Sequence, residues 1–100
     1  MRPTTLRLDL YIQLHYTIRW DSAKSTLLKA QRGVSFEDIV QQRLLTVVEH
    51  PRRQEQSILL YEYQGYAWAV PCVVRGDEVF LKTLYPSSKY TRMWERGELQ

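Results

Sequence analysis

The sequence SILLYEYQGYAWAVPCVVRGDEVFLKTLY, at residues 57–85, decides the fold of this 100-residue chain. It holds three apolar runs, at residues 57–63, 66–74 and 78–85, separated by Gln64-Gly65 and by Arg75-Gly76-Asp77. Short glycine-containing segments between such runs are typical of β-hairpins. The stretch therefore predicts an antiparallel meander of three strands.

The middle run of this stretch is apolar on both faces, as a central strand covered from both sides would be. It also contains Pro71, which has no backbone N–H to donate to a neighbouring strand. We therefore expect either a β-bulge or an edge position at Pro71.

Two helices are predicted before the meander. Residues 21–32 have apolar side chains at a spacing of about 3.6 residues, Asp21 can cap the first turn, and Gly33 can end the helix in a left-handed conformation. The face of this helix that we expect to be buried carries Ala23, Leu27, Leu28 and Ala30. A second helix is predicted from its cap Ser35 to about Leu45. Its buried stripe consists of Phe36, Ile39, Val40 and Leu44.

The N-terminal segment alternates between apolar and polar side chains from Leu6 to Trp20, which predicts a β-strand. At roughly 3.3 Å per residue, a strand of this length would span about 50 Å. We therefore expect residues 1–13 to form an N-terminal strand extension or arm, and residues 16–20 to join the sheet of a single domain at residues 14–96. The apolar side chains of the extension need a cover. This cover is either the sheet of a second copy, in a homodimer, or the chain's own sheet after a bend near Gln13.

The C-terminal segment predicts one more helix. Pro86 ends the last strand, and Ser87 or Ser88 can cap a short basic helix at residues 89–96. The predicted order of elements is therefore β-α-α-β-β-β-α. Helices packed on a mostly antiparallel sheet in this way define an α+β domain.

Composition excludes several classes of protein. A hydrophobic content of 44% in 100 residues is enough for one core, so we expect one domain. One cysteine and two histidines exclude an internal disulfide and the usual four-ligand zinc site, and we expect no cofactor. The sequence contains no P-loop, nucleophile elbow or glycine-rich nucleotide motif, which argues against nucleotide-dependent and triad enzymes. It contains neither an apolar run long enough to span a membrane nor a signal peptide, so we expect a cytoplasmic protein without membrane contact.

The charge of the chain favours an anionic partner, because 14 lysines and arginines against 11 acidic residues give a net charge of +3. Lys82 stands out, since it lies between Leu81 and Leu84 in an otherwise apolar run, where a long cation snorkels or points into a polar concavity. Alternatively, the lysines and arginines near the ends of predicted elements form an ordinary solvated surface. The cations near the ends of predicted elements are Lys24, Lys29, Arg32, Arg52, Arg53, Lys82, Lys89 and Arg92.

His50 and a group of aromatic residues each allow two interpretations. His50, just before Pro51, is either a general base near neutral pH or an idle loop residue. The aromatic residues are either a stacking platform for single-stranded bases or cross-strand pairs that hold the register of the sheet. They are Tyr61, Tyr63, Tyr66, Trp68 and Tyr85.

Two separated motifs resemble those of small toxins. The first motif, which resembles the opening of BrnT-family toxins, runs Trp20-Asp21-Ser22-Ala23-Lys24 and then Arg32-Gly33-Val34-Ser35-Phe36-Glu37-Asp38. The second is similar to the closing strand and helix start of a related branch, in which a Lys-Thr strand runs into a Pro-Ser-Arg-Lys segment. It reads Phe80-Leu81-Lys82-Thr83-Leu84-Tyr85-Pro86-Ser87-Ser88-Lys89, with Ser88 in the place of the arginine.

The resemblance implies a RelE-like fold and a type II toxin, which is a small ribonuclease that cleaves RNA without a metal and is held inactive by a cognate antitoxin. In that chemistry the ribose 2′-hydroxyl attacks the adjacent phosphate, cations stabilise the developing charge, and one group manages the proton. Carried over to this chain, the resemblance implies catalytic roles for Arg32, Glu37, Lys82 and Lys89. The residues predicted to bind the RNA are Lys24, Lys29, Arg53 and Arg92.

Alternatives to this interpretation stay open. With Ser88 in place of an arginine, either Arg92 supplies the cation from one helical turn further on, or the chain has lost catalysis. In the second case it is a catalytically silent module that binds nucleic acid or a protein through the same basic face. A third hypothesis is a protein-interaction domain that works through its long first strand.

Overall fold

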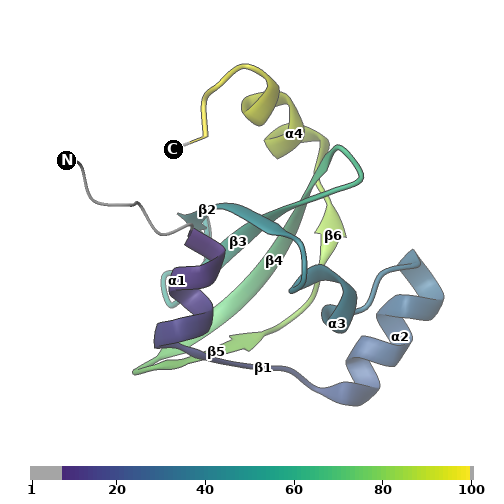
Figure 1. Cartoon of the computed structure of the whole chain (residues 1–100), viewed down its shortest axis with the longest axis vertical. Coiled ribbons are helices and arrows are strands. Elements are labelled where there is room, and N and C mark those ends of the chain that lie inside the picture. Colours follow the sequence, from purple (N-terminus) through teal and green to yellow (C-terminus); the bar gives the residue numbers. More distant parts are fainter. Residues whose placement is uncertain (1–7, 100) are drawn as a thin grey trace.

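A sheet with helices on both of its faces forms the body of the protein (Figure 1). The structure is a computed structural model and describes residues 8–99. These residues form an α+β fold with a mostly antiparallel sheet, as the sequence predicts. The elements are α1 (Leu8–His15), β1 (Thr17–Arg19), α2 (Ser22–Arg32), α3 (Phe36–Ile39), β2 (Arg43–Glu49), β3 (Gln56–Tyr63), β4 (Tyr66–Arg75), β5 (Glu78–Leu81), β6 (Tyr85–Pro86) and α4 (Ser88–Glu95).

The strands of the described chain lie in the order β1-β5-β4-β3-β2, and β6 pairs with β4 beyond the end of β5. The predicted meander is confirmed, because β3, β4 and β5 pair antiparallel with one another in sequence order. Its third strand is shorter than the predicted residues 78–85, since β5 ends at Leu81 and Tyr85 belongs to the separate strand β6. The only parallel pair in this sheet of residues 8–99 joins β1 to β5. This pairing brings the start of α2, which follows β1, beside the end of β5.

Pro71 lies where β4 changes its partner on one side. β5 pairs with Cys72 to Arg75, and β6 pairs with Trp68 and Ala69. The Pro71 carbonyl accepts a hydrogen bond of 2.8 Å from the Lys82 N–H. The nitrogen and the carbonyl of one strand residue point to the same side, so the missing N–H of proline faces the gap between β5 and β6. The ladder tolerates Pro71 because no strand needs its donor there.

Helix α2 begins and ends as predicted. The Asp21 side chain accepts a hydrogen bond of 3.0 Å from the Lys24 N–H, and Gly33 closes the helix with φ +78°. Leu28 is buried, but Leu27 is 48% exposed and Ala23 and Ala30 are exposed as well, so the predicted buried face is wrong for these three residues. Successive helical residues are rotated by about 100°, and α2 packs along one narrow stripe that includes Leu28 and leaves Leu27 at its edge.

The second predicted helix is much shorter than expected. Ser35 caps α3 through a capping box with Asp38, but the helix ends at Ile39, and the next element is strand β2. The prediction of a helix to about Leu45 is therefore wrong. The β-branched run Thr46-Val47-Val48 favours a strand, and its pairing with β3 gives it backbone partners.

The N-terminal segment is also corrected. Residues 8–15 form helix α1 rather than the first half of a strand, whereas β1 lies within the predicted residues 16–20. Leu8 and Ile12 are four residues apart, so a helix brings them to one face, where Ile12 belongs to the main hydrophobic core and Leu8 packs against it. For residues 8–13 the strand arm does not exist, and the homodimer through this strand loses its basis there. Leu6 lies outside the described residues.

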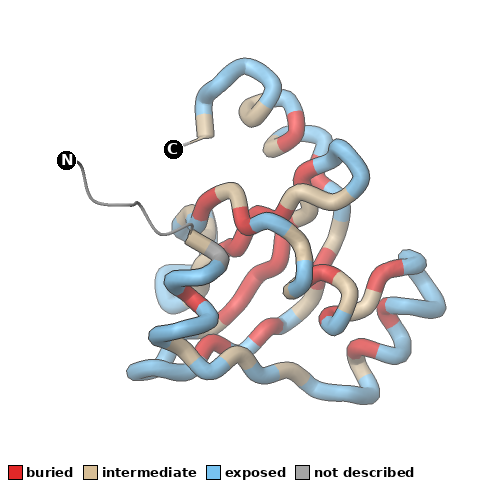
Figure 2. Tube along the Cα trace, in the orientation of Figure 1, coloured by how far each residue is buried: buried red, intermediate tan, exposed pale blue. Residues whose placement is uncertain are grey.

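The core has a layer on each face of the sheet (Figure 2). Helices α1, α2 and α3 contribute to the larger layer, which contains Ile12, Leu28, Phe36 and Ile39. On the opposite face, the smaller layer lies under α4 and the C-terminal segment. It consists of Ile58, Leu60 and Ala69, with Leu45, Val48, Tyr85, Tyr90 and Leu99 packed against them. Within residues 8–99, no helix combines the length and the apolar character needed to cross a membrane.

Candidate nucleic-acid interface

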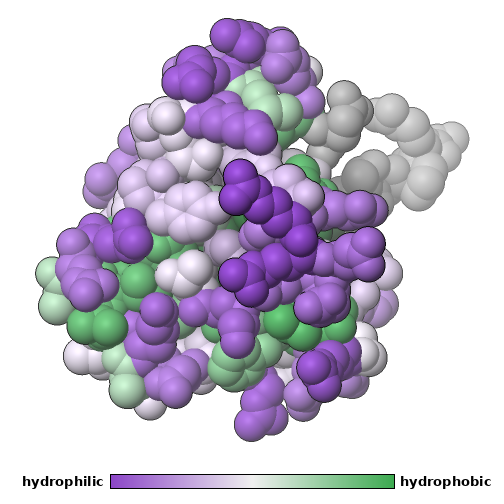
Figure 3. All heavy atoms as spheres, turned by 180° about the vertical axis from the view of Figure 1, so that it is seen from behind, coloured by the Kyte–Doolittle hydropathy of each residue, from purple (hydrophilic) through white to green (hydrophobic). Residues whose placement is uncertain are grey.

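Part of the sheet face opposite α1 and α3 is left open beside α4. Val73 and Phe80 are cross-strand partners on β4 and β5, and Arg75 pairs with Glu78 two residues further along. Because residues two apart on a strand share a face, these four side chains point to the same side of the sheet. Figure 3 views the molecule from behind, and on this side hydrophilic and apolar side chains lie next to one another.

Lys82 joins three hollows of the surface. The first lies on the open sheet face, where Val73, Arg75, Glu78 and Phe80 line it together with Lys82. The second lies between α2 and the end of β5. The third lies between the loop after β2 and the segment that leads to β6. Lys82 is exposed because β5 ends at Leu81, so its side chain is free of the sheet at the point where the three hollows meet.

The second hollow brings Lys24 to Lys82. Lys24 is in the first turn of α2, next to the cap Asp21. The remaining lining is largely apolar and includes Ala23, Leu27 and Phe80. The Asp21 carboxylate also lines this hollow, so the two ammonium groups leave a net charge of +1 beside apolar side chains, which favours an anion that carries an apolar part.

The third hollow brings His50 and Arg53 to Lys82, together with Gln56, Thr83 and Tyr85. The His50 Nδ1 accepts hydrogen bonds from the backbone N–H groups of Arg52, at 3.1 Å, and Arg53, at 3.2 Å. While Nδ1 accepts these bonds, the neutral imidazole carries its proton on Nε2. The hollow therefore offers an imidazole N–H, a guanidinium and an ammonium, which are all donors to a phosphate.

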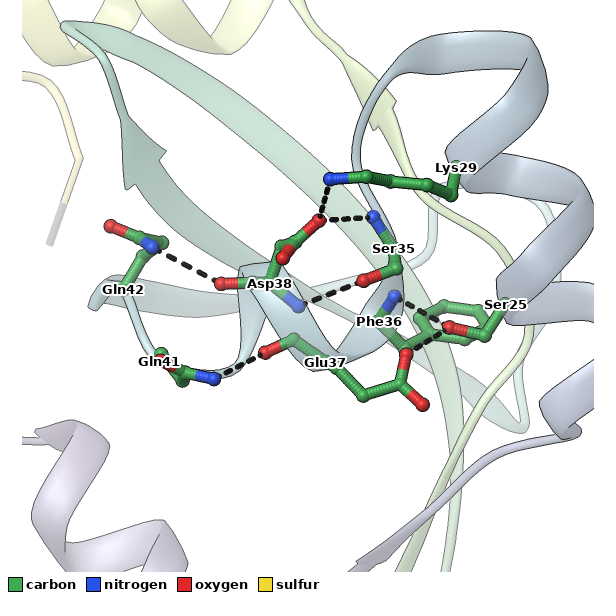
Figure 4. A network of polar contacts seen from close by, with 8 residues as sticks. All are labelled: Ser25, Lys29, Ser35, Phe36, Glu37, Asp38, Gln41 and Gln42. Atoms are coloured by element: carbon green, nitrogen blue, oxygen red, sulfur yellow. Dashed lines mark hydrogen bonds and ion pairs between the residues drawn. The ribbon is translucent and has the colours of Figure 1, made fainter.

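Glu37 connects three elements, and Figure 4 shows its contact with Ser25 of α2. Its carboxylate accepts hydrogen bonds from the Ser25 hydroxyl, at 2.5 Å, and from the Trp20 indole N–H, at 3.2 Å. The Ser25 hydroxyl oxygen also accepts a bond of 2.9 Å from the Phe36 N–H. The hydrogen bond from Ser25 is the main cause that lowers the pKa of Glu37. These contacts give Glu37 a structural role, because they fix α2 and its Lys24 against α3 and the end of β1.

Lys29 is also engaged within the protein. Its ammonium lies 2.8 Å from the Asp38 carboxylate, which also accepts a bond from the Ser35 N–H (Figure 4). The hydrogen bond from Lys29 is the main cause that lowers the pKa of Asp38 to about 2, and Asp38 in turn raises the pKa of Lys29. The Lys29 charge is therefore balanced by Asp38 before any ligand binds.

The structure brings together three of the eight residues predicted as site residues, namely Lys24, Arg53 and Lys82. Arg32 lies at the far end of α2, about 12 Å from Lys24 along the helix axis at about 1.5 Å per residue. Lys89 and Arg92 are exposed on α4, where the Lys89 ammonium lies 5.3 Å from the centre of the Tyr90 ring. None of Arg32, Lys89 and Arg92 lines the three hollows described above.

Sequence reasoning missed Arg75, Glu78 and Phe80. Arg75 was part of a predicted turn, and Phe80 was one apolar residue in a strand. The signal that could have found them is the hairpin register around Gly76, which pairs residues of β4 and β5 and predicts which side chains share a face. Among the described residues, no three His, Cys, Asp or Glu side chains gather as a candidate metal site.

Comparisons with known proteins add one structural relative. No family model matches the chain, and no curated protein matches its sequence. Among solved structures, the chain is similar to the ribonuclease toxin BrnT of Brucella abortus, with a TM-score of 0.50 and 19% sequence identity over 73% of this chain and 97% of that chain. The similarity confirms the BrnT-like fold that the two sequence motifs imply.

Proposed function

We propose that this protein is the toxin of a type II toxin–antitoxin system and cleaves RNA without a metal ion. The observation that carries the proposal is the position of Lys82, where three hollows meet that also hold Lys24, Arg53 and His50. The fold, which is similar to that of a ribonuclease toxin, supports the proposal. In this function the protein acts in the cytoplasm, where its RNA substrate is.

The proposed reaction is a transesterification within the RNA chain. The ribose 2′-oxygen forms a bond to the adjacent phosphorus, and the bond between phosphorus and the 5′-oxygen of the next nucleotide breaks. Water in the open hollow takes the proton from the 2′-hydroxyl, and the 5′-oxygen receives a proton from water. The products are a 2′,3′-cyclic phosphate and a 5′-hydroxyl.

The side chains of the third hollow stabilise the charge that grows on the phosphate oxygens. The Lys82 ammonium and the Arg53 guanidinium supply positive charge, and the His50 Nε2–H donates a hydrogen bond. His50 acts as a donor rather than as a base, because its Nδ1 is already engaged by two backbone N–H groups. Lys24 holds the neighbouring phosphate through the second hollow. Arg32 and Lys89, which the resemblance implied as catalytic, line none of the three hollows, and in this proposal they contact more distant parts of the RNA together with Arg92.

A cleavage assay tests this function. Purified protein is incubated with a single-stranded RNA in the presence of EDTA, and the ends of the fragments are identified. We expect cleavage in EDTA with 2′,3′-cyclic phosphate ends, and no cleavage at a 2′-deoxy position. Lys82→Ala should lower the rate about 10²-fold, because a donor aimed at transition-state charge has an effect of that size. Arg96→Ala is the matched control, since it removes one exposed cation that lines none of the described hollows.

Other outcomes of this assay identify the alternatives. Cleavage that requires a metal contradicts the proposed mechanism. Binding of RNA through Lys82 without any cleavage supports the catalytically silent binding module instead.

The proposed partner is a cognate antitoxin protein. A short reading frame for a small repressor beside the gene supports this part of the proposal, and co-expression with its product should restore growth to cells that the toxin arrests. Growth arrest that the neighbouring protein does not relieve contradicts it.

A further inference from the structure

Phe80 stands between two of the three hollows. It lines both the hollow of the open sheet face and the hollow beside α2, and its side chain is 39% exposed although β5 is an inner strand of the sheet. Lys82 lines the same two hollows, and its ammonium lies over one face of the Phe80 ring, 5.5 Å from the ring centre. An exposed aromatic ring beside a cation is the combination that binds single-stranded nucleic acid by stacking.

The hollow of the open sheet face adds groups that can recognise a base. Its lining contains two pairs of cross-strand partners, the apolar pair Val73 and Phe80 and the charged pair Arg75 and Glu78. Glu78 also pairs with Arg19 at 3.5 Å, but both side chains are more than half exposed, at 53% and 62%. Exposed pairs of this kind are weak, so the Glu78 carboxylate is available to a ligand.

We propose that this hollow binds a guanine base of the RNA, next to the phosphate that Lys82 holds. The proposal rests on the proposed function, which makes Lys82 a phosphate ligand. The base stacks on Phe80, the Arg75 guanidinium donates to O6 and N7 of guanine, and the Glu78 carboxylate accepts from N1–H and the 2-amino group. Guanine offers two adjacent acceptors and two adjacent donors on separate edges, and it therefore matches an arginine and a carboxylate at the same time.

Binding of short RNAs tests the proposal. The probes are fluorescein-labelled hexanucleotides with 2′-O-methyl groups, which cannot be cleaved by attack of the 2′-oxygen. One probe contains only uracil, and the other has a single guanine at the third position. Fluorescence anisotropy should give a dissociation constant about tenfold lower for the guanine probe with the unchanged protein, because Arg75 and Glu78 match the edges of guanine and a bidentate base contact discriminates by about 1 to 3 kcal/mol.

Substitutions at Phe80 and at Glu78 separate stacking from edge recognition. Phe80→Leu removes the ring and should abolish the tenfold difference, whereas Phe80→Trp should keep it. Tyr66→Leu is the matched control, because Tyr66 is an equally exposed aromatic residue at the start of β4 and lines none of the described hollows. Glu78→Gln tests the edge contact. Replacing guanine by inosine, which lacks the 2-amino group, should weaken binding several-fold in the unchanged protein and have little effect in Glu78→Gln.

The outcomes distinguish this inference from the proposed function. If Lys82→Ala weakens binding of both probes but Phe80→Leu leaves the guanine preference unchanged, the guanine site is wrong and the RNA-binding function stands. An equal affinity for the two probes in the unchanged protein also overturns the guanine site. If neither probe binds, or if Lys82→Ala has no effect on binding, both proposals are wrong. Thermal unfolding of each variant serves as the control that it is folded. Glu78→Gln tests the site without changing the apolar residues Val73 and Phe80.

Discussion

At the scale of single residues, Ser25 connects the two helices that carry the first sequence motif. It is buried, its hydroxyl donates to the Glu37 carboxylate, and its oxygen accepts from the Phe36 N–H. Ser25→Ala leaves the buried Phe36 N–H without an acceptor, so we expect a loss of about 1 to 3 kcal/mol in the free energy of unfolding. Urea unfolding followed by circular dichroism measures this change.

The control for Ser25 lies on the same helix. Ser22 is exposed, and Ser22→Ala should change the free energy of unfolding by no more than about 0.5 kcal/mol. Equal effects of the two substitutions would contradict the role assigned to Ser25. Because Ser25 is adjacent to Lys24, Ser25→Ala should also weaken RNA binding without removing any cation.

The ion pair of Asp38 with Lys29 should make the folded protein less stable in acid. Lys29 holds the pKa of Asp38 at about 2, below its value of about 3.9 in an unfolded chain. The folded protein therefore favours the charged carboxylate, which adds stability above about pH 4 and loses this effect as the pH falls toward about 2. Urea unfolding over this range should show a smaller decrease of stability for Asp38→Asn than for the unchanged protein. Identical pH dependence would show that the ion pair does not contribute.

At the scale of elements, substitutions in α1 test whether residues 8–15 form a helix or the strand that their alternation predicts. In a strand, Ile12 and Leu14 would share a face, so replacing either by alanine would lower the free energy of unfolding by a similar amount. In helix α1, Ile12 is 9% exposed in the core and Leu14 is 71% exposed. Ile12→Ala should therefore lower the free energy of unfolding by about 2 to 4 kcal/mol, and Leu14→Ala by no more than about 0.5 kcal/mol. Chemical denaturation of the two variants compares them directly, and equal losses would favour the strand.

At the scale of the whole molecule, the proposed RNA contact makes binding depend on salt. Each phosphate contact to a single strand contributes about −0.7 to the slope of the logarithm of the association constant against the logarithm of salt concentration. With Lys24, Arg53 and Lys82 each holding a phosphate, we expect a slope of about −2 for a short single-stranded RNA. Lys82→Ala should reduce its size by about 0.7, and Arg96→Ala should leave it unchanged. Equal slopes for both variants would point to diffuse attraction by the net charge.

Local chemistry predicted much of the fold from the sequence. The caps Asp21 and Ser35, the left-handed end at Gly33 and the turns of the meander rest on hydrogen bonds and backbone preferences that act within a few residues. Such interactions are fully encoded in short stretches of sequence, and the structure contains them where they were predicted. The exposure of Lys82 was also predictable from its neighbours, because a lysine in an apolar run places its ammonium in water.

Tertiary packing decided the rest. The alternation in residues 8–15 also places Leu8 and Ile12 four residues apart, so it fits a helix as well as a strand, and contact with the core selects the helix. Residues 43–49 became a strand because β3 offers them backbone partners. The candidate site depends on the same non-local pairing, since Lys24, Arg53 and Lys82 come from separate elements. Only the parallel pairing of β1 with β5, which carries α2 to the end of β5, and the interruption of the β4 ladder at Pro71 bring them to common hollows.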